Sequence, residues 1–368
     1  MKPALVLCLL APVALACRRA AGESGGLTLE QKLPAKFAAL SNVVELHNGR
    51  VAFADTKAKL FFMADLKTGR VDTLGTRVDS LIPDAPPEQY KFPGWVSHLG
   101  RDTIALVDFS GIRTTLWSES GKPLGVLPIA EVAGKTPVLV YDTVGYGYKV
   151  DYQSILGGAE PGHTVRPDSV AVLRIALKSG KVDTIANLAS PEYGQAMFGE
   201  QYQQAAKVFA PNDFFGVLPN GTAWLARGHE NRVDWRASDG GWVTGKGHDY
   251  AKQPVTQADR DRVLAQVRER GKQFGMPQNL PIQYPFAETK APFDFALGRP
   301  NGEVWLQRPR AQEDAPLTYD VFDRHGAWVR AVPFPKGVSL AGFGANGSIY
   351  GSIKQDDGSR TVGKYELR

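Results

Sequence analysis

Short apolar runs that flank Asn-Gly turns recur along the chain, and two copies of this pattern match closely. Residues 211–227 read PNDFFGVLPNGTAWLAR, and residues 292–308 read PFDFALGRPNGEVWLQR. Aligned without a gap, the copies share an Asp-Phe pair, a Pro-Asn-Gly turn, the Trp-Leu pair after it and a closing arginine. Asn-Gly suits a two-residue hairpin turn, so each copy predicts a strand, a tight turn and a returning strand. Such self-similarity within one chain is typical of a repeat fold.

A second hairpin repeats downstream of the first. Residues 65–75 (DLKTGRVDTLG) and 176–186 (ALKSGKVDTIA) share Leu-Lys, a glycine and Val-Asp-Thr. Each reads as an apolar strand, a polar turn and an alternating strand. Weaker copies of the inner hairpin stand at 43–54, 95–107 and 340–353. An inner and an outer hairpin together make a unit of four strands, and the units start near residues 41, 95, 137, 212, 293 and 338.

These units predict an all-β fold, a six-bladed β-propeller of four-stranded antiparallel blades, because a blade buries its faces only when its neighbours stack on it. The alternative is a β-sandwich, which has no reason to repeat both hairpins. The last unit holds three strands, so we expect residues 27–33 (LTLEQKL) to supply its outer strand and close the ring. The predicted organisation is a signal peptide at 1–16, a flexible tether at 17–26 and the propeller at 27–368.

The Asn-Gly inner hairpins that continue with Trp or Tyr, and the outer hairpins with a central glycine, resemble those of secreted bacterial six-bladed β-propellers of the NHL-like and TolB-like types. The resemblance covers nearly all of the chain after the leader. It implies the fold and an exported location. It implies little about chemistry, since proteins of this kind are mostly uncharacterised.

The first residues predict export. Lys2 gives a positive start, the apolar run Ala4–Ala16 is too short to span a bilayer, and small residues precede Cys17. Cleavage there yields a soluble secreted protein or a lipoprotein acylated on Cys17, although Ala14 stands where a lipobox usually has leucine. Cys8 lies within the leader, so Cys17 is the lone thiol of the exported chain and has no internal disulfide partner. A lone thiol at the predicted cleavage point favours lipidation of Cys17.

Location and partners follow from the leader and the charge pattern. By resemblance to proteobacterial sorting signals, Arg18 favours the outer membrane, so we expect an outer-membrane or periplasmic lipoprotein, or a soluble secreted protein. A lipid anchor would be the chain's only membrane contact. The net charge of +5 comes from 43 basic and 38 acidic residues without a basic tract, which argues against nucleic acid as a partner. A closed ring leaves no edge for dimerisation, which favours a monomer.

Two kinds of insertion interrupt the blades. Residues 254–276 predict a surface helix that starts with a capping box of Thr256 and Asp259, and that covers one mouth of the ring or packs on its rim. Residues 143–170 and 187–210 read as irregular loops rich in tyrosine, where binding usually resides. Their tyrosines either form a ligand platform or pack the loops on the blades, and the binding candidates are Tyr146, Tyr148, Tyr152 and Tyr202.

Catalytic patterns are scarce. The sequence contains no nucleophile elbow, zinc-protease motif, P-loop or dinucleotide fingerprint, and the six histidines are dispersed, several of them in turns where a solvated role is expected. Asp213 and Asp294 each open an innermost strand, so their carboxylates are candidates for calcium at the channel mouth. The alternative is a hydrogen bond to a neighbouring backbone N–H. We expect Arg227 and Arg308 to pair with carboxylates between blades. No cofactor is predicted, and calcium is the metal that the acids could bind.

The leading functional hypothesis is a non-enzymatic binding or interaction scaffold of the cell envelope with an unknown ligand, and a further possibility is an interaction protein that binds peptides or glycans through the tyrosine-rich loops. The alternative is a calcium-dependent lactonase-like hydrolase or a streptogramin-lyase-like enzyme acting at the channel mouth. Converging carboxylates at that mouth would favour the enzyme, whereas an apolar lining would favour the scaffold. Fold alone decides neither.

Overall fold

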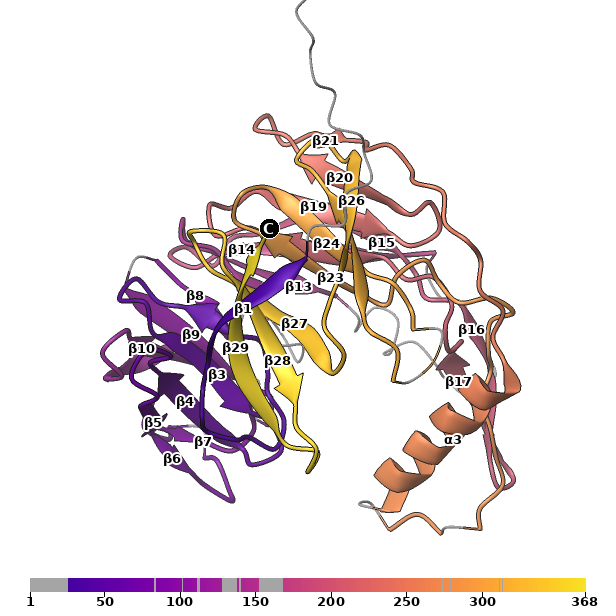
Figure 1. The fold of residues 1–368 in the computed structure, drawn as a ribbon, viewed down its shortest axis with the longest axis horizontal. Helices are drawn as coiled ribbons and strands as arrows, with labels where there is room; N and C mark the ends of the chain where they lie inside the picture. The colour runs from indigo at the N-terminus through magenta and orange to yellow at the C-terminus, as the bar shows by residue number, and fades with distance from the viewer. Residues whose placement is uncertain are drawn as a thin grey trace, which may run out of the picture.

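A computed structural model describes residues 26–82, 84–100, 102–110, 113–127, 138, 140–151, 168–272, 275–277, 279–310, 312 and 314–368. The predicted signal peptide, Cys17 and Tyr152 lie outside these residues. The described chain forms six four-stranded antiparallel sheets (Figure 1). The innermost strands of all six line one central channel. The prediction of a six-bladed β-propeller is confirmed.

The blades are numbered in chain order from their innermost strands. Blade 1 comprises β2 (Val44–Glu45), β3 (Val51–Asp55), β4 (Leu60–Ala64) and β5 (Val71–Leu74). Blade 2 comprises β8 (Pro93–His98), β9 (Thr103–Asp108), β10 (Arg113–Ser118) and β11 (Pro123–Leu127). Blade 3 comprises β12 (Val140–Tyr141), β13 (Tyr146–Val150), β14 (Ser169–Ala176) and β15 (Val182–Ala189).

The second half of the ring follows the same order. Blade 4 comprises β18 (Phe214–Val217), β19 (Ala223–Arg227), β20 (Arg232–Arg236) and β21 (Trp242–Val243). Blade 5 comprises β23 (Phe295–Arg299), β24 (Glu303–Gln307), β25 (Thr318–Phe322) and β26 (Trp328–Pro333). Blade 6 comprises β27 (Val338–Phe343), β28 (Ile349–Lys354), β29 (Arg360–Leu367) and, from the other end of the chain, β1 (Leu27–Lys32).

The ring closes as predicted. Strand β1, indigo in Figure 1, pairs antiparallel with β29, in yellow, from Leu27 opposite Leu367 to Lys32 opposite Gly363. The contact continues past the strand, where the Leu33 N–H donates to the Val362 carbonyl at 2.9 Å. The N-terminal segment therefore completes the last blade and covers the edge of β29 that would otherwise be exposed.

The inner hairpins use a different turn from the predicted one. In blade 4, the Leu218 N–H donates to the Thr222 carbonyl and the Gly221 N–H to the Leu218 carbonyl, which defines a three-residue loop. Gly221 has φ of +83°, whereas Asn220 is not among the residues with positive φ. This is a type I turn with the glycine in a bulge, so the prediction of a two-residue turn is wrong.

The core lies between neighbouring blades. One cluster joins blades 6 and 1 through Leu33, Phe53 and Phe62, and another joins blades 5 and 6 through the fully buried Trp305 and Tyr319. Equivalent clusters fill each of the other four seams. Each blade therefore contributes both faces to burial, as stacked repeats require.

Two faces of the ring differ. The connections between successive blades lie on one side of the ring, which we call the insertion face. The hairpin turns between the first and second strands of each blade lie on the opposite side, which we call the turn face. The insertion face carries a three-stranded sheet of β17 (Gln201–Ala206), β16 (Tyr193–Phe198) and β22 (Ile282–Gln283), helix α3 (Gln257–Lys272), and the short pair β6 (Thr76–Arg77) and β7 (Gln89–Tyr90).

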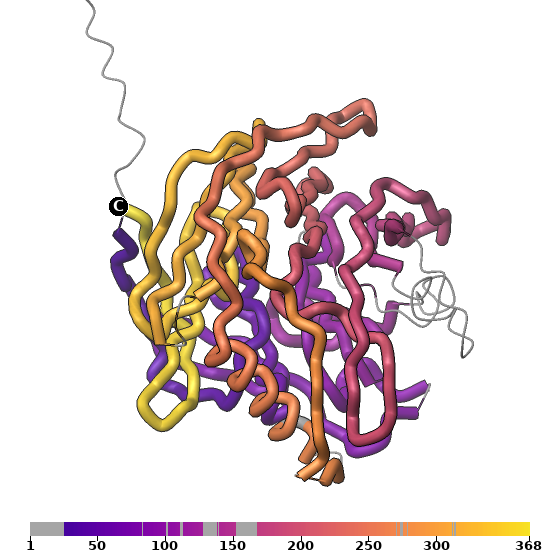
Figure 2. The backbone as a smooth tube through the Cα atoms, turned by 90° about the vertical axis from the view of Figure 1, so that its right-hand side faces the viewer, coloured from indigo at the N-terminus to yellow at the C-terminus, as the bar shows by residue number. Residues whose placement is uncertain are grey.

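Helix α3 confirms the predicted surface helix. The Asp259 N–H donates to Thr256 Oγ1 at 3.2 Å and the Thr256 N–H donates back to Asp259 Oδ2 at 3.1 Å, which is the predicted capping box. The helix lies beside the β16–β17 hairpin (Figures 1 and 2), and the described residues that line the central channel include none of α3. The interpretation of 187–210 as an irregular loop is wrong, because β16 and β17 pair over their full length. No described helix is long and apolar enough to span a bilayer.

Candidate functional site

The central channel is a cavity of about 350 Å³ lined by the first strand of every blade. Its walls are mainly apolar, with Trp95, Val140, Phe214, Leu297 and Phe343 among them. Some of its polar groups bond to the protein, whereas His98 Nδ1 and Trp224 Nε1 have no hydrogen-bond partner among the described residues. Asn42, for example, donates its amide to the Val96 carbonyl at 2.6 Å and accepts the Val96 N–H at 3.0 Å, which ties blade 1 to blade 2.

Asp213 stabilises the seam between blades 3 and 4. Its side chain is 3% exposed and accepts the N–H groups of Ala189 and Gly228 at 2.9 and 3.0 Å. Arg227 also forms an ion pair with Asp213, with 2.7 Å between Arg227 Nη1 and Asp213 Oδ2. These contacts match the alternative of a backbone hydrogen bond, and both carboxylate oxygens are committed to protein donors rather than available to calcium.

Asp294 occupies the equivalent position in blade 5 but has different partners. Its Oδ1 accepts the Gln307 amide at 2.7 Å, and Gln307 in turn accepts the Tyr319 hydroxyl at 2.8 Å. Burial raises the pKa of Asp294, against the opposing effect of the Gln307 hydrogen bond. Among the described residues, neither Asp213 nor Asp294 belongs to a group of three possible metal ligands. The structure therefore does not bring together the calcium ligands that the lactonase-like alternative requires of these two acids.

The repeated arginines pair within their own blades. Arg227 contacts Asp213 and Asp234 of blade 4, and it reaches blade 3 only through the Asn187 carbonyl. Arg308 forms two hydrogen bonds of 2.7 Å to Asp320. The expectation of carboxylate pairs between blades is wrong, because β19 and β24 each lie beside a strand that presents its own acid.

Two of the tyrosine candidates pack in blade 3. Tyr148 is buried, and its hydroxyl donates to Asp142 at 2.7 Å. Burial and this carboxylate raise the pKa of Tyr148. Tyr146 is half-buried beneath the Arg174 guanidinium, which lies 4.7 Å from its ring centroid. Both contacts fit the packing alternative, and the role of Tyr152 stays a prediction.

Tyr202 lies in a groove on the insertion face. The groove holds about 1080 Å³ between the β16–β17 hairpin and α3, and we call it the insertion groove. Tyr202 is 63% exposed, far more than Tyr146 or Tyr148. Apolar side chains alternate here with amides, and the lining includes Phe198, Val263, Val267, Met276, Gln203 and Gln266.

Strand β17 forms the outer edge of the inserted sheet. The described sheet order places β16 on one side of β17 and no strand on the other. The Lys207 N–H donates to the Glu192 carbonyl, so the alternation of an antiparallel pair turns the backbone groups of Gln201, Gln203 and Ala205 toward β16. The N–H and C=O groups of Tyr202, Gln204 and Ala206 consequently point outward.

A buried ion pair anchors the helix that forms the other wall of the groove. Lys290 Nζ lies 3.0 Å from Asp259 Oδ1, with both side chains almost fully buried. Arg262 adds a hydrogen bond of 2.6 Å to the same oxygen. Burial alone would raise the pKa of Asp259, but hydrogen bonds from Lys290 and Thr256 outweigh it and lower the pKa to about 2.

Low pH should therefore destabilise the packing of helix α3. Because the pKa of Asp259 is depressed in the folded protein, its stabilising effect is complete above the ordinary value of 3.8 and is lost as the pH falls toward 2. Hydrogen exchange of the α3 amides should accelerate over this interval. Asp259→Asn should show fast exchange throughout, whereas Asp261→Asn, at an exposed position on the same helix, should behave like the parent. An acid response that survives in Asp259→Asn would contradict this assignment.

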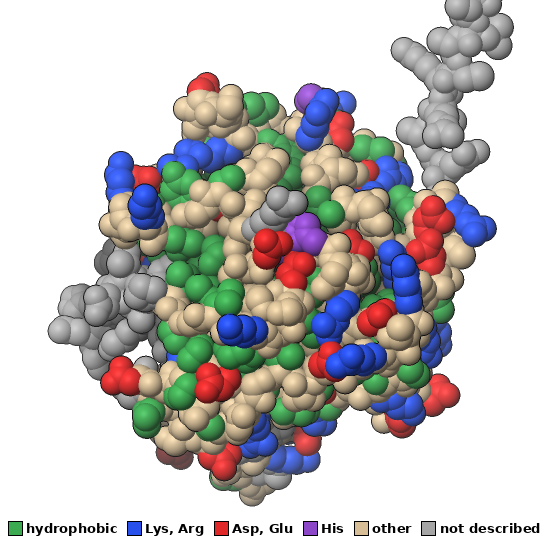
Figure 3. Space-filling model, turned by 90° about the vertical axis from the view of Figure 1, so that its left-hand side faces the viewer, with side chains coloured by type: hydrophobic (Ala, Val, Ile, Leu, Met, Phe, Trp, Pro, Cys, Tyr) green, Lys and Arg blue, Asp and Glu red, His purple; other side chains and the backbone are tan. Residues whose placement is uncertain are grey.

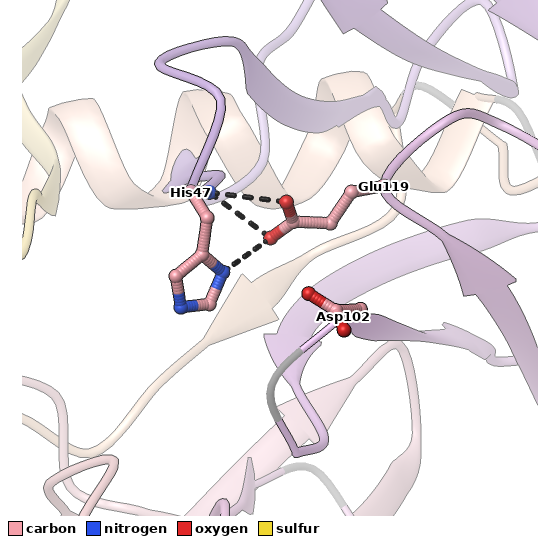
Figure 4. A group of neighbouring side chains, drawn as sticks. All are labelled: His47, Asp102 and Glu119. Carbon is pink, nitrogen blue, oxygen red and sulfur yellow. Dashed lines mark hydrogen bonds and ion pairs between the residues drawn. The ribbon is translucent and has the colours of Figure 1, made fainter.

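A cluster of one histidine and two acidic residues lies on the turn face, where blades 1 and 2 meet. His47 Nδ1 lies 2.7 Å from Glu119 Oε1, and the His47 backbone N–H donates to the same carboxylate at 3.0 Å. Asp102 approaches both, and one ligand atom from each of the three residues lies within 4.8 Å of the others (Figure 4). Figure 3 views the molecule from the side of these blades and shows a histidine beside acidic side chains. No local pattern in the sequence predicts this cluster, and a solvated role is what the sequence predicts for histidines in turns.

One comparison with a solved structure, at a TM-score of 0.53, supports the fold. No protein-family model and no curated protein sequence matches the chain. A candidate exported protein from Bacteroides fragilis has a similar structure, with a TM-score of 0.53 and 10% identity over 93% of this chain and 95% of its own. A gluconolactonase from Xanthomonas campestris reaches a TM-score of 0.47 at 11% identity, over 94% and 96% of the two chains. A streptogramin B lyase reaches 0.39 at 12% identity, over 93% and 98%.

Proposed function

We propose that this protein is an exported binding protein of the bacterial cell envelope, and that it captures extended peptide segments on the insertion face. The observation that carries the proposal is the free edge of β17 beside the insertion groove. An extended peptide can add to such an edge as a further strand, with affinity from backbone hydrogen bonds and selectivity from nearby pockets.

The composition of β17 suits this role. Its sequence, QYQQAA, carries neither charge nor proline. Proteins usually protect an exposed edge with lysine, proline or a bulge, and β17 pairs with β16 without a register shift. An unprotected edge on an exported protein is explained if a partner covers it. The groove then offers apolar contacts from Phe198 and Val263 and hydrogen bonds from Gln203 and Gln266.

Export and anchoring belong to the same proposal. The leader pattern and the lone thiol Cys17 support an exported lipoprotein, and the similar structure from Bacteroides fragilis is itself a candidate exported protein. Residues 17–26 would tether the ring to the membrane. Closure by β1 gives blade 6 the same four strands as the other blades, which supports a monomer.

Two substitutions at Gln204 distinguish peptide binding through the backbone of β17 from binding through the Gln204 side chain. Gln204→Pro removes an outward N–H and blocks the edge, yet proline is tolerated where an edge N–H faces solvent. Gln204→Ala removes the side chain and keeps the N–H. For peptides selected from a random displayed library, we expect Gln204→Pro to weaken binding by about tenfold or more, because a hydrogen bond is lost and the added strand clashes. Gln204→Ala should bind like the parent.

Fluorescence anisotropy with labelled peptides would measure both affinities, and circular dichroism would verify that both variants fold. Equal affinities for the two variants would contradict capture by the edge. Failure of the library to yield any peptide that binds the parent would contradict peptide binding altogether.

A further inference from the structure

Three hairpin turns bring chemically related side chains together on the turn face. His47 comes from the inner hairpin of blade 1, Asp102 from the inner hairpin of blade 2 and Glu119 from the outer hairpin of blade 2. The cluster thus spans the seam between two blades (Figure 4), and the strand order places it on the side of the ring opposite to the insertion groove.

Existing contacts already hold two of the three groups in place. The His47 backbone N–H donates to both Glu119 oxygens, at 3.0 and 3.2 Å, and the Glu119 N–H donates to the Asp102 carbonyl at 3.3 Å. The His98 ring packs edge-on against the His47 ring, with 5.8 Å between the centroids. The Glu119 side chain is 11% exposed, so its carboxylate is largely withdrawn from water.

Among the described residues, no fixed cation other than the His47 ring balances the charges in the cluster. Asp102 and Glu119 bring two carboxylates close together, and among the described residues Glu119 has only the His47 ring as an ion-pair partner. The Asp102 carboxylate forms no hydrogen bond or ion pair within the described part of the chain. Two carboxylates that share a site repel one another unless a proton or a cation lies between them.

We propose that His47, Asp102 and Glu119 bind a zinc ion that links blades 1 and 2. Imidazole nitrogen with carboxylate oxygen suits Zn²⁺, whereas Ca²⁺ takes oxygen ligands alone. Zinc ligands lie about 2.0–2.2 Å from the ion, so two of them stand about 3.4 Å apart in a tetrahedron. The 2.7 Å between His47 Nδ1 and Glu119 Oε1 would lengthen on zinc binding, and the other separations, within 4.8 Å, would shorten through small movements of the exposed His47 and Asp102 side chains.

The zinc ion would link blades 1 and 2 across the seam between them. Three protein ligands leave a fourth tetrahedral position for water. Binding to the folded protein alone would stabilise the contact between blades 1 and 2 by mass action. This role is independent of peptide capture, because the residues that carry it lie on the opposite face.

Calorimetry with zinc chloride on the chelator-treated protein tests the proposal. We expect one Zn²⁺ per chain and a melting temperature that rises with zinc and returns on addition of chelator. His47→Ala, Asp102→Asn and Glu119→Gln should each weaken zinc binding by about tenfold or more. His325→Ala, which removes another exposed histidine from a turn of the same face, should bind zinc like the parent.

X-ray absorption at the zinc edge should detect one imidazole nitrogen among oxygen ligands. His47 is exposed, so His47→Ala should melt like the parent in the presence of chelator and differ only when zinc is present. Unchanged zinc affinity in His47→Ala, absence of stoichiometric binding, or tighter binding of Ca²⁺ than of Zn²⁺ would each overturn the assignment.

Discussion

Replacing Leu33 with alanine is expected to destabilise the propeller by about 3 kcal/mol, because a fully buried leucine loses its contacts and leaves a cavity. Leu33 directly follows β1 and packs with Phe37, Phe53 and Val362 in the cluster between blades 6 and 1. Its backbone is fixed at the same time by hydrogen bonds with Val362 and with the Thr361 hydroxyl. The surroundings belong to two paired sheets and can collapse only slightly into the space.

Leu29→Ala provides the matched control. Leu29 lies in β1 itself, but it is 46% exposed, so its truncation should cost about 1 kcal/mol or less. Urea unfolding followed by tryptophan fluorescence would compare the two variants. If Leu33→Ala unfolds at the same urea concentration as Leu29→Ala, the N-terminal segment does not contribute to the closure of the ring in the way that the structure indicates.

The blades could be predicted because their signals are local and repeated. Each copy of the Pro-Asn-Gly hairpin encodes the same pair of strands, and the capping box of Thr256 and Asp259 depends on residues three positions apart. The turn type was misread although its signal was present. Pro219 has its φ fixed near the value that the first central position of a type I turn requires, which leaves the positive φ to Gly221.

The candidate sites depend on contacts that no local pattern encodes. His47 and Glu119 meet because blades 1 and 2 stack, and stacking relates hairpins whose sequences carry no mark of their neighbours. The β16–β17 hairpin was missed because glutamine and alanine are weak strand formers. Its two-residue loop at Gly199, with φ of +63°, was the available signal. Asp213 repeats in Asp294, yet the two acquire different partners, since Gln307, which bonds to Asp294, stands where the other copy has Ala226.

Replacing Cys17 with serine is expected to move the protein from the membrane fraction to the soluble fraction. The sequence has two cysteines, and Cys8 lies inside the apolar leader, which makes Cys17 the only thiol that an exported chain would retain. Serine cannot form the thioether that begins lipoprotein maturation. Each buried CH₂ of an acyl chain contributes about 0.8 kcal/mol to membrane binding, so loss of the lipid removes nearly all of the affinity.

Cys8→Ser is the matched control, because it removes a thiol from the leader and leaves Cys17 in place. Cell fractionation of the parent and both variants would show where each protein resides, and intact mass spectrometry would show whether the mature parent chain carries acyl groups. The parent and Cys8→Ser should both be acylated and membrane-bound. A Cys17→Ser protein that still sediments with membranes, or a parent whose mature chain carries no lipid, would leave the soluble secreted form as the product of this leader.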